Sequence, residues 1–228
     1  NVSNFGDTAD RAGSLSQSVV SGLGMGGSIQ YLGFGDLDLR LGSGADTFGT
    51  IGTHAGETRV RAGAGNDRLT VENIDGATNL ETEDGADTVT VVLNPDRENA
   101  SEDQNPGVAT EPAPYFESLL TVNGGGTTAD TDVMNVISTA PTPDSGTLTE
   151  SLLTGLSLKT GIAYAQLEVV NLDLGDNANT FTIQSTHPGE TNLVTGGDAD
   201  VVQIRSIAGP TTVDTGGDDD TINVGSLA

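Results

Sequence analysis

The residues Gly63-Ala64-Gly65-Asn66-Asp67-Arg68-Leu69-Thr70-Val71 decide the fold prediction, because a glycine-rich loop ending in aspartate leads directly into an alternating apolar run. Alternation with a period of two is typical of a half-buried β-strand. The pattern returns along much of the chain with a period of about 20 residues. The residues at its aspartate position, called anchors below, are Asp46, Asp67, Asp87, Asn179, Asp200 and Asp220.

Each period also carries a second, plainer turn. A glycine lies at its centre and a threonine follows shortly after it, in the pairs Gly56/Thr58, Gly76/Thr78, Gly189/Thr191 and Gly209/Thr211. One period therefore predicts two strands and two turns, and such periods stack at about 4.8 Å. We predict an all-β chain that forms a parallel β-solenoid, similar to a β-roll, from coils of about 20 residues with inserted loops.

A longer repeat contains the short one. Sliding the sequence along itself until Leu41 meets Leu174 aligns residues 41–48 with 174–181, and 53–58 with 186–191, without a gap. We therefore expect a first repeat unit, residues 1–133, and a shorter second unit, residues 134–228, within one continuous solenoid. The repeat and the start at Asn1 suggest a segment of a longer tandem array.

Two segments interrupt the short period. Residues 94–118 hold four of the eight prolines and show no alternation, which predicts an inserted polar surface loop. Residues 139–161 contain Pro141 and Pro143. The sequence leaves two interpretations open for this second segment, a wider coil or a short helix.

The composition excludes several classes of protein. The 228 residues include 33 acidic and 8 basic side chains, and a formal net charge of -25 disfavours contact with nucleic-acid phosphates. The chain has no cysteine for disulfides or thiolate-bound metals, and no apolar run near the roughly 20 residues of a membrane span. The arginines are scattered along the sequence and no nucleophile–base pair stands out, so we expect no catalytic residues and no enzyme.

Stacking the coils should bring the anchors into columns, with Asp46, Asp67 and Asp87 in one and Asp200 and Asp220 in another. Carboxylates roughly 5 Å apart repel by about 3 kcal/mol per pair at an effective dielectric constant near 20. Because cations are few, oxygen ligands on flexible glycine loops favour Ca²⁺ as the neutralising ion. The alternative is that the aspartates form Asx-turns and the glycines supply positive φ.

Residues 63–69 resemble the core of the RTX nonapeptide, G-G-x-G-x-D-x-U-x, of haemolysin-type calcium-binding repeat proteins. Residues 42–48 match it as well, and residues 196–202 and 216–222 match it more loosely. The first glycine of the family pattern is replaced here by Leu41, Ala62, Thr82, Thr195 and Thr215. The resemblance implies Ca²⁺ held between coils by loop carbonyls and anchor side chains. The resulting metal-ligand candidates are Asp46, Asp67, Asp87, Asp198, Asp200, Asp218, Asp220, Gly42, Gly44, Gly63, Gly65, Asn179, Asp176 and Asp84.

These observations predict a structural, calcium-stabilised repeat segment of a long extracellular bacterial protein, such as a stalk, filament or surface-layer element. Its expected partners are calcium and head-to-tail copies or neighbouring repeats. One alternative is an adhesin-like binding module whose inserted loops recognise a receptor or glycan. A further alternative is a polysaccharide-active β-helix enzyme. His54 and His187 occupy equivalent turns and are interpreted as turn-capping residues, not as metal ligands.

Overall fold

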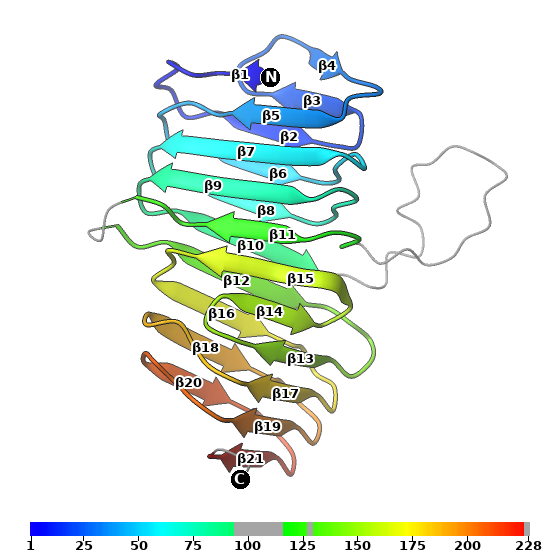
Figure 1. Ribbon diagram of the computed structural model, residues 1–228, viewed down its shortest axis with the longest axis vertical. Coiled ribbons are helices and arrows are strands. Elements are labelled where there is room, and N and C mark those ends of the chain that lie inside the picture. Colours follow the sequence, from blue (N-terminus) through cyan, green and yellow to red (C-terminus); the bar gives the residue numbers. More distant parts are fainter. Residues whose placement is uncertain (94–115, 127–129, 226–228) are drawn as a thin grey trace, which may run out of the picture.

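The computed structural model describes residues 1–93, 116–126 and 130–225 (Figure 1). These residues form 21 strands and no helix, so the described part of the chain has no helix that could cross a membrane. The strands make two mostly parallel sheets of 11 and 10 strands, called sheet A and sheet B. The all-β prediction is confirmed, and the arrangement is compatible with a solenoid.

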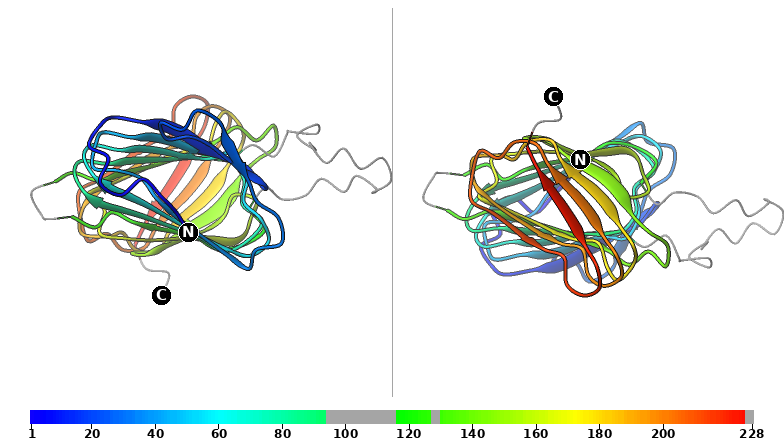
Figure 2. Two further views of the ribbon diagram at one scale, coloured as in Figure 1. Left: turned by 90° about the horizontal axis from the view of Figure 1, so that it is seen from above. Right: turned by 90° about the horizontal axis from the view of Figure 1, so that it is seen from below.

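The two sheets face each other along the whole length of the molecule, as the views down the long axis show (Figure 2). Sheet A contains, in spatial order, β1 (Val2–Ser3), β5 (Asp36–Arg40), β7 (Glu57–Ala64), β9 (Thr78–Asp84), β11 (Leu120–Asn123), β15 (Leu158–Ala165), β14 (Leu152–Gly155), β13 (Ser145–Leu148), β17 (Thr180–Ile183), β19 (Val201–Ile204) and β21 (Thr221–Val224). Sheet B contains β20 (Thr211–Asp214), β18 (Glu190–Val194), β16 (Val169–Asp173), β12 (Val133–Ser138), β10 (Thr88–Leu93), β8 (Arg68–Val71), β6 (Thr47–Thr50), β2 (Ala12–Leu15), β3 (Val19–Gly22) and β4 (Ser28–Gln30).

Paired residues on neighbouring parallel strands are one short period apart in the sequence. Outside two meanders described below, consecutive strands alternate between the sheets. In sheet B, β6, β8 and β10 are parallel neighbours, with Phe48 opposite Leu69 and Leu69 opposite Val89. These two steps equal the spacings from Asp46 to Asp67 and from Asp67 to Asp87 in the sequence. Each period therefore adds one strand to each sheet.

The core is a narrow layer of apolar side chains between the sheets. Phe48 and Phe181 are buried in it, and Tyr31 and Tyr164 are buried as well. Each phenylalanine ring lies against a glycine of the neighbouring strand. A Cβ atom on Gly146 would come within 2.8 Å of the Phe181 ring. The thin core thus accommodates its largest side chains where the paired residue on the neighbouring strand is a glycine and has no side chain.

Residues 139–161 form neither a wider coil nor a helix, so both interpretations of this segment were wrong. The segment builds a meander in which β13 and β14 are antiparallel and β15 is antiparallel to β14. Gly155, Leu156 and Ser157 have φ values of 82°, 50° and 62°, and this left-handed backbone reverses the chain within one sheet. The first unit has a matching meander, β2–β3–β4. Alternation predicts a strand but not its partner, so the sequence did not distinguish a reversal from a coil.

Equivalent strands of the two units lie in opposite sheets. β5, β7 and β9 lie in sheet A, whereas their counterparts in the second unit, β16, β18 and β20, lie in sheet B. Between β2 and its counterpart β13, consecutive strands change sheet nine times, which is an odd number. The second unit is therefore rotated by half a turn about the long axis relative to the first.

Most of the predicted inserted loop, residues 94–115, lies outside the described residues. The end of the predicted loop, from Phe116 to Ser118, belongs to the folded body, which corrects the predicted boundary. Phe116 is buried and forms a parallel bridge with Ile74, and the Ser118 hydroxyl donates to the Asp75 carbonyl. An aromatic residue at the end of a polar segment was the signal that the core resumes there.

Replacing Gly146 by alanine tests the tight packing beside Phe181. We expect the Gly146→Ala variant to lose about 1–3 kcal/mol of unfolding free energy, because the new methyl group overpacks the core. The melting temperature should then fall by roughly 2–10 °C, measured by circular dichroism. Gly197→Ala is the matched control, since the nearest atom to its Cβ position is 3.8 Å away. Equal melting temperatures for the two variants would contradict the packing argument.

Candidate functional site: a buried aspartate ladder

The anchors of the first unit form a buried column, which we call the aspartate ladder. Asp46, Asp67 and Asp87 are each 1% exposed. The backbone N–H of Asp46 donates to Asp67 Oδ1 at 2.6 Å, and that of Asp67 donates to Asp87 Oδ1 at 2.7 Å. The Asp87 N–H continues the series to Asp132 Oδ1 at 3.0 Å. Each layer is thus tied to the next by a charge-assisted hydrogen bond.

The second unit repeats this geometry. Asp144 N–H donates to Asn179 Oδ1 and Asn179 N–H to Asp200 Oδ1, both at 2.7 Å. Asp200 N–H then donates to Asp220 Oδ1 at 2.9 Å. The structure therefore brings the anchors together in the two columns expected from the sequence. Asp132 and Asp144 are further ladder positions. They are not among the anchors assigned from the sequence, because the interruptions hide the period around them.

The ladder positions differ in what their second side-chain atom contacts. Asp46 Oδ2 accepts the Gly42 N–H at 2.9 Å. Asp200 Oδ2 accepts the hydroxyl of Thr195. At Asn179 the second atom is the amide nitrogen, which donates to the carbonyls of Gly175 at 3.1 Å and Thr195 at 2.9 Å. Asn179 therefore shows that backbone carbonyl oxygens face this atom of the ladder.

The second oxygens of Asp67 and Asp87 are buried and make no hydrogen bond. The pKa of Asp67 is raised to about 7, mainly by burial and also by the neighbouring carboxylates Asp87 and Asp46, while the hydrogen bond from the Asp46 amide lowers it. Burial also raises the pKa of Asp87, where the nearby Thr82 hydroxyl acts in the opposite direction. A buried carboxylate oxygen without a donor requires either a proton or a cation.

The other candidate ligands lie outside the ladder, on the loops. Asp84, Asp176, Asp198 and Asp218 are exposed. The loop glycines line a close approach between layers: a Cβ on Gly63 would lie 2.0 Å from the Gly42 carbonyl oxygen, and one on Gly65 2.5 Å from that of Gly44. The candidate set thus separates into a buried ladder and an exposed acidic rim.

The fit to Ca²⁺ differs from one position to the next. Asp67 fits a hard cation best, since its second oxygen is buried and has no hydrogen-bond partner. Asp46, Asn179 and Asp200 do not fit, because protein donors or acceptors already occupy their second atoms. Nowhere in the described residues do three His, Cys, Asp or Glu side chains converge as a metal cage. A cation at Asp67 would therefore depend on carbonyl ligands as well as the carboxylate.

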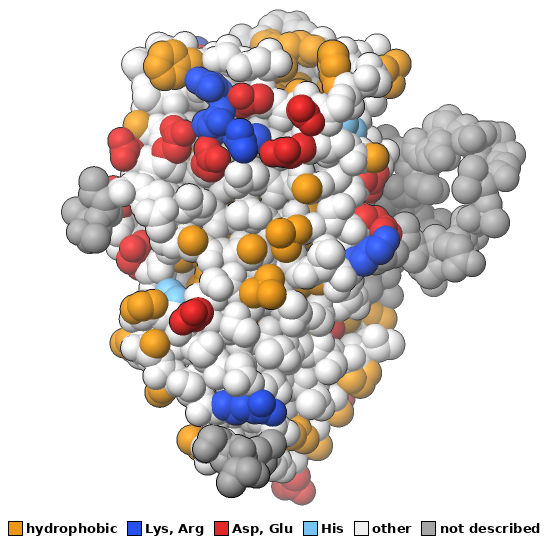
Figure 3. All heavy atoms as spheres, in the orientation of Figure 1, with side chains coloured by type: hydrophobic (Ala, Val, Ile, Leu, Met, Phe, Trp, Pro, Cys, Tyr) orange, Lys and Arg blue, Asp and Glu red, His pale blue; other side chains and the backbone are white. Residues whose placement is uncertain are grey.

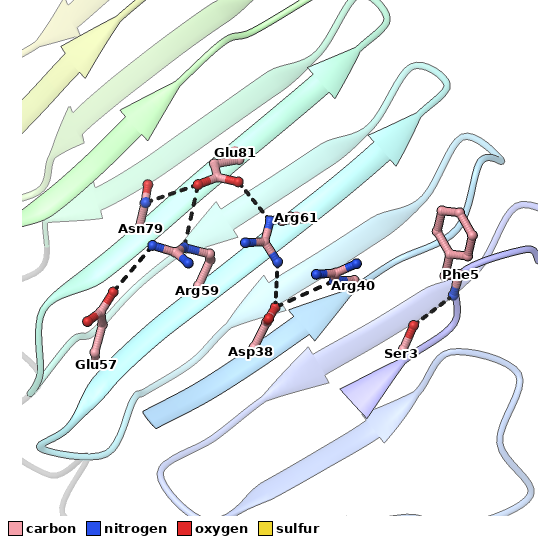
Figure 4. Close-up of polar contacts among 9 residues, drawn as sticks. All are labelled: Ser3, Phe5, Asp38, Arg40, Glu57, Arg59, Arg61, Asn79 and Glu81. Atoms are coloured by element: carbon pink, nitrogen blue, oxygen red, sulfur yellow. Dashed lines mark hydrogen bonds and ion pairs between the residues drawn. The ribbon is translucent and has the colours of Figure 1, made fainter. Parts of the chain in front are cut away.

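Three of the seven arginines come together in space, although the sequence shows them scattered along the chain. Arg40, Arg59 and Arg61 gather on the outer face of β5 and β7 (Figures 3 and 4). Arg61 lies 2.9 Å from both Asp38 and Glu81. The other pairs are Arg59–Glu81 at 3.5 Å, Arg59–Glu57 at 3.6 Å and Arg40–Asp38 at 3.9 Å. Three cations thus face three carboxylates, so the cluster is locally neutral.

The two histidines occupy matching turns. The His54 ring is edge-on to Tyr31 at 5.8 Å, and His187 is edge-on to Tyr164 at 6.0 Å. Their Nδ1 atoms lie 3.3 Å and 3.4 Å from the hydroxyls of Thr58 and Thr191. Burial lowers the pKa of His187. These contacts agree with the turn-capping interpretation.

Comparison of the chain with models of known protein families, with characterised proteins and with solved structures finds no match.

The ladder predicts that acid stabilises the fold. The pKa values of Asp67 and Asp132 are raised to about 7 and about 6 from 3.8, so between pH 4 and 7 the folded chain binds more protons than the unfolded chain. The free energy of unfolding should therefore fall as the pH rises through this range. We expect the melting temperature in EDTA to be higher at pH 5 than at pH 8. A melting temperature that increases with pH would contradict the ladder's electrostatics.

Asparagine substitutions separate two ladder positions. Asp67→Asn keeps the Oδ1 acceptor and gives the second atom donors like those of Asn179, so we expect it to stabilise the fold at pH 8 by about 1 kcal/mol. Asp46→Asn instead turns an amide towards the Gly42 N–H and should cost about 1–3 kcal/mol. Thermal melts at pH 8 measure both variants. Destabilisation of similar size in the two would show that their second oxygens are equivalent after all.

Proposed function

We propose that the chain is a segment of a parallel β-solenoid with a structural function, serving as a stiff spacer in a longer extracellular repeat protein. Supporting this proposal, the parallel registers step by one sequence period per layer and an apolar core runs between the sheets. The observation that carries it is the aspartate ladder, in which a backbone amide of each layer binds the next layer's anchor. Such bonds run along the stacking axis and resist separation of the layers.

Calcium is part of the proposal. The free, buried oxygen of Asp67 and the net charge of -25 both favour uptake of a divalent cation. Asp67 with the neighbouring loop carbonyls would hold the ion, which would supply the positive charge that the column lacks. The exposed rim of Asp176, Asp198 and Asp218 adds a second region of high negative charge. Millimolar extracellular calcium would then rigidify a stack that repels itself without the ion.

The proposed partners are further copies or repeats docked end to end. Ile222 and Val224 on β21 are 46% and 79% exposed. Their equivalents in the first unit, Val89 and Val91, are 1% and 0% exposed because β12 covers β10. An added strand would therefore bury apolar side chains that the last layer leaves open.

Far-UV circular dichroism and thermal melts in EDTA, in 5 mM MgCl₂ and in 5 mM CaCl₂ test this proposal. We expect a β spectrum in every buffer and a melting temperature at least about 3 °C higher in calcium than in EDTA, corresponding to about 1 kcal/mol. Magnesium should act less, because it loses its bound water reluctantly. Identical melts in all buffers would overturn the calcium proposal, and absence of a β spectrum would overturn the solenoid itself.

A further inference from the structure

We propose that the residue at two equivalent positions, Ala62 and Thr195, decides whether the ladder aspartate five residues later takes an external cation. A hydroxyl group that donates to the carboxylate closes the site, whereas a methyl group leaves it open to Ca²⁺. Asp67, preceded by Ala62, is then a cation position, and Asp200, preceded by Thr195, is not. The inference rests on the proposed calcium function and states which ladder positions carry it.

Ala62 and Thr195 are equivalent in sequence and in structure. Each lies five positions before its anchor, Ala62 on β7 and Thr195 directly after β18, and each is 0% exposed. Both positions correspond to the first glycine of the nonapeptide motif. Thr195 carries a hydroxyl and a methyl group that Ala62 lacks, and both side chains are fully buried.

The hydroxyl of Thr195 has a specific task. It donates to Asp200 Oδ2, while the Thr195 carbonyl accepts from the Asn179 amide nitrogen at 2.9 Å. A single residue thus serves two successive ladder side chains. Asn179 Nδ2 and Asp200 Oδ2 therefore both have hydrogen-bond partners within the protein, and neither side chain needs an ion to satisfy it.

At Ala62 this donor is missing. Asp67 is 1% exposed and its Oδ2 has no hydrogen-bond partner. The charged groups that act on Asp67 are Asp87 and Asp46, both carboxyl groups. A buried oxygen with two acidic neighbours and no donor recruits a divalent oxygen-binding cation.

At Asp46 and Asp87 the residue five positions earlier does not donate to the carboxylate, and other groups determine the surroundings of the second oxygen. Leu41 precedes Asp46 and offers no donor, but the Gly42 N–H closes that site at 2.9 Å. Thr82 precedes Asp87 and has a hydroxyl, which donates to the Gly124 carbonyl in place of Asp87. Asp67 is therefore the position of these three where the second oxygen has neither a backbone donor nor a neighbouring hydroxyl.

Reciprocal substitutions test the inference, with the calcium-induced shift in melting temperature at pH 7.5 as the readout. Ala62→Thr should raise the melting temperature in EDTA and reduce the calcium shift at least twofold. Ala62→Val adds the same bulk without a hydroxyl and should keep the calcium shift. Equilibrium dialysis with ⁴⁵Ca²⁺ should show one bound ion fewer for Ala62→Thr than for Ala62→Val. An unchanged shift and stoichiometry in Ala62→Thr would overturn the inference.

The second unit provides a test that adds no bulk to the core. Thr195→Val removes only the hydroxyl and should lower the melting temperature in EDTA while enlarging the calcium shift. This arm remains decisive if Ala62→Thr does not fold, and a calcium shift equal to that of the unmodified chain would overturn the inference. Absence of a calcium shift in the unmodified chain would overturn the proposed calcium function as well. If the unmodified chain shows a calcium shift and all three variants show the same shift, this inference alone is overturned.

Discussion

The hydrogen bond from an anchor amide to the aspartate of the next layer is the constraint on which the rest of the structure depends. It joins residues one period apart, such as Asp46 to Asp67 and Asp67 to Asp87. To reach that amide the carboxyl group must turn inward, and the glycine loop must let one backbone pass close to another. A Cβ on Gly63 would lie 2.0 Å from the Gly42 carbonyl oxygen, which explains why glycine stands there.

The two units stabilise the outer faces of their equivalent strands in different ways. On β5, β7 and β9, Arg61 bridges Asp38 and Glu81 across three strands. On β16 and β18, the Asn192 amide donates to Asn171 at 2.9 Å, and Asn171 continues the series to Asn135 on β12. Both solutions satisfy polar side chains at the strand spacing of about 4.8 Å. The inner ladder, by contrast, is kept in both units, so it is the shared element of the architecture.

Sequence reasoning was most successful where one period determined the outcome. The anchors were expected in columns, and Asp46, Asp67 and Asp87 do stack, as do Asn179, Asp200 and Asp220. It failed where the period broke. The meander at residues 139–161 was not foreseen, because β14 alternates like any other strand and only its partner reveals the reversal. The arginine cluster was also missed, because Arg40 and Arg61 lie far apart in sequence but sit side by side on β5 and β7.

The sequence by itself determined the strands, their two-residue alternation, the period and the stacking of the anchors in columns, since all of these follow from local backbone and side-chain periodicity. Only the tertiary structure decided the half-turn between the units and the environment of each second carboxyl oxygen. The physical reason is that a buried polar atom is satisfied by whatever the neighbouring layer presents. Asp46 and Asp67 occupy equivalent places in the sequence motif. The Gly42 amide donates to the second oxygen of Asp46, whereas the second oxygen of Asp67 has no hydrogen-bond donor.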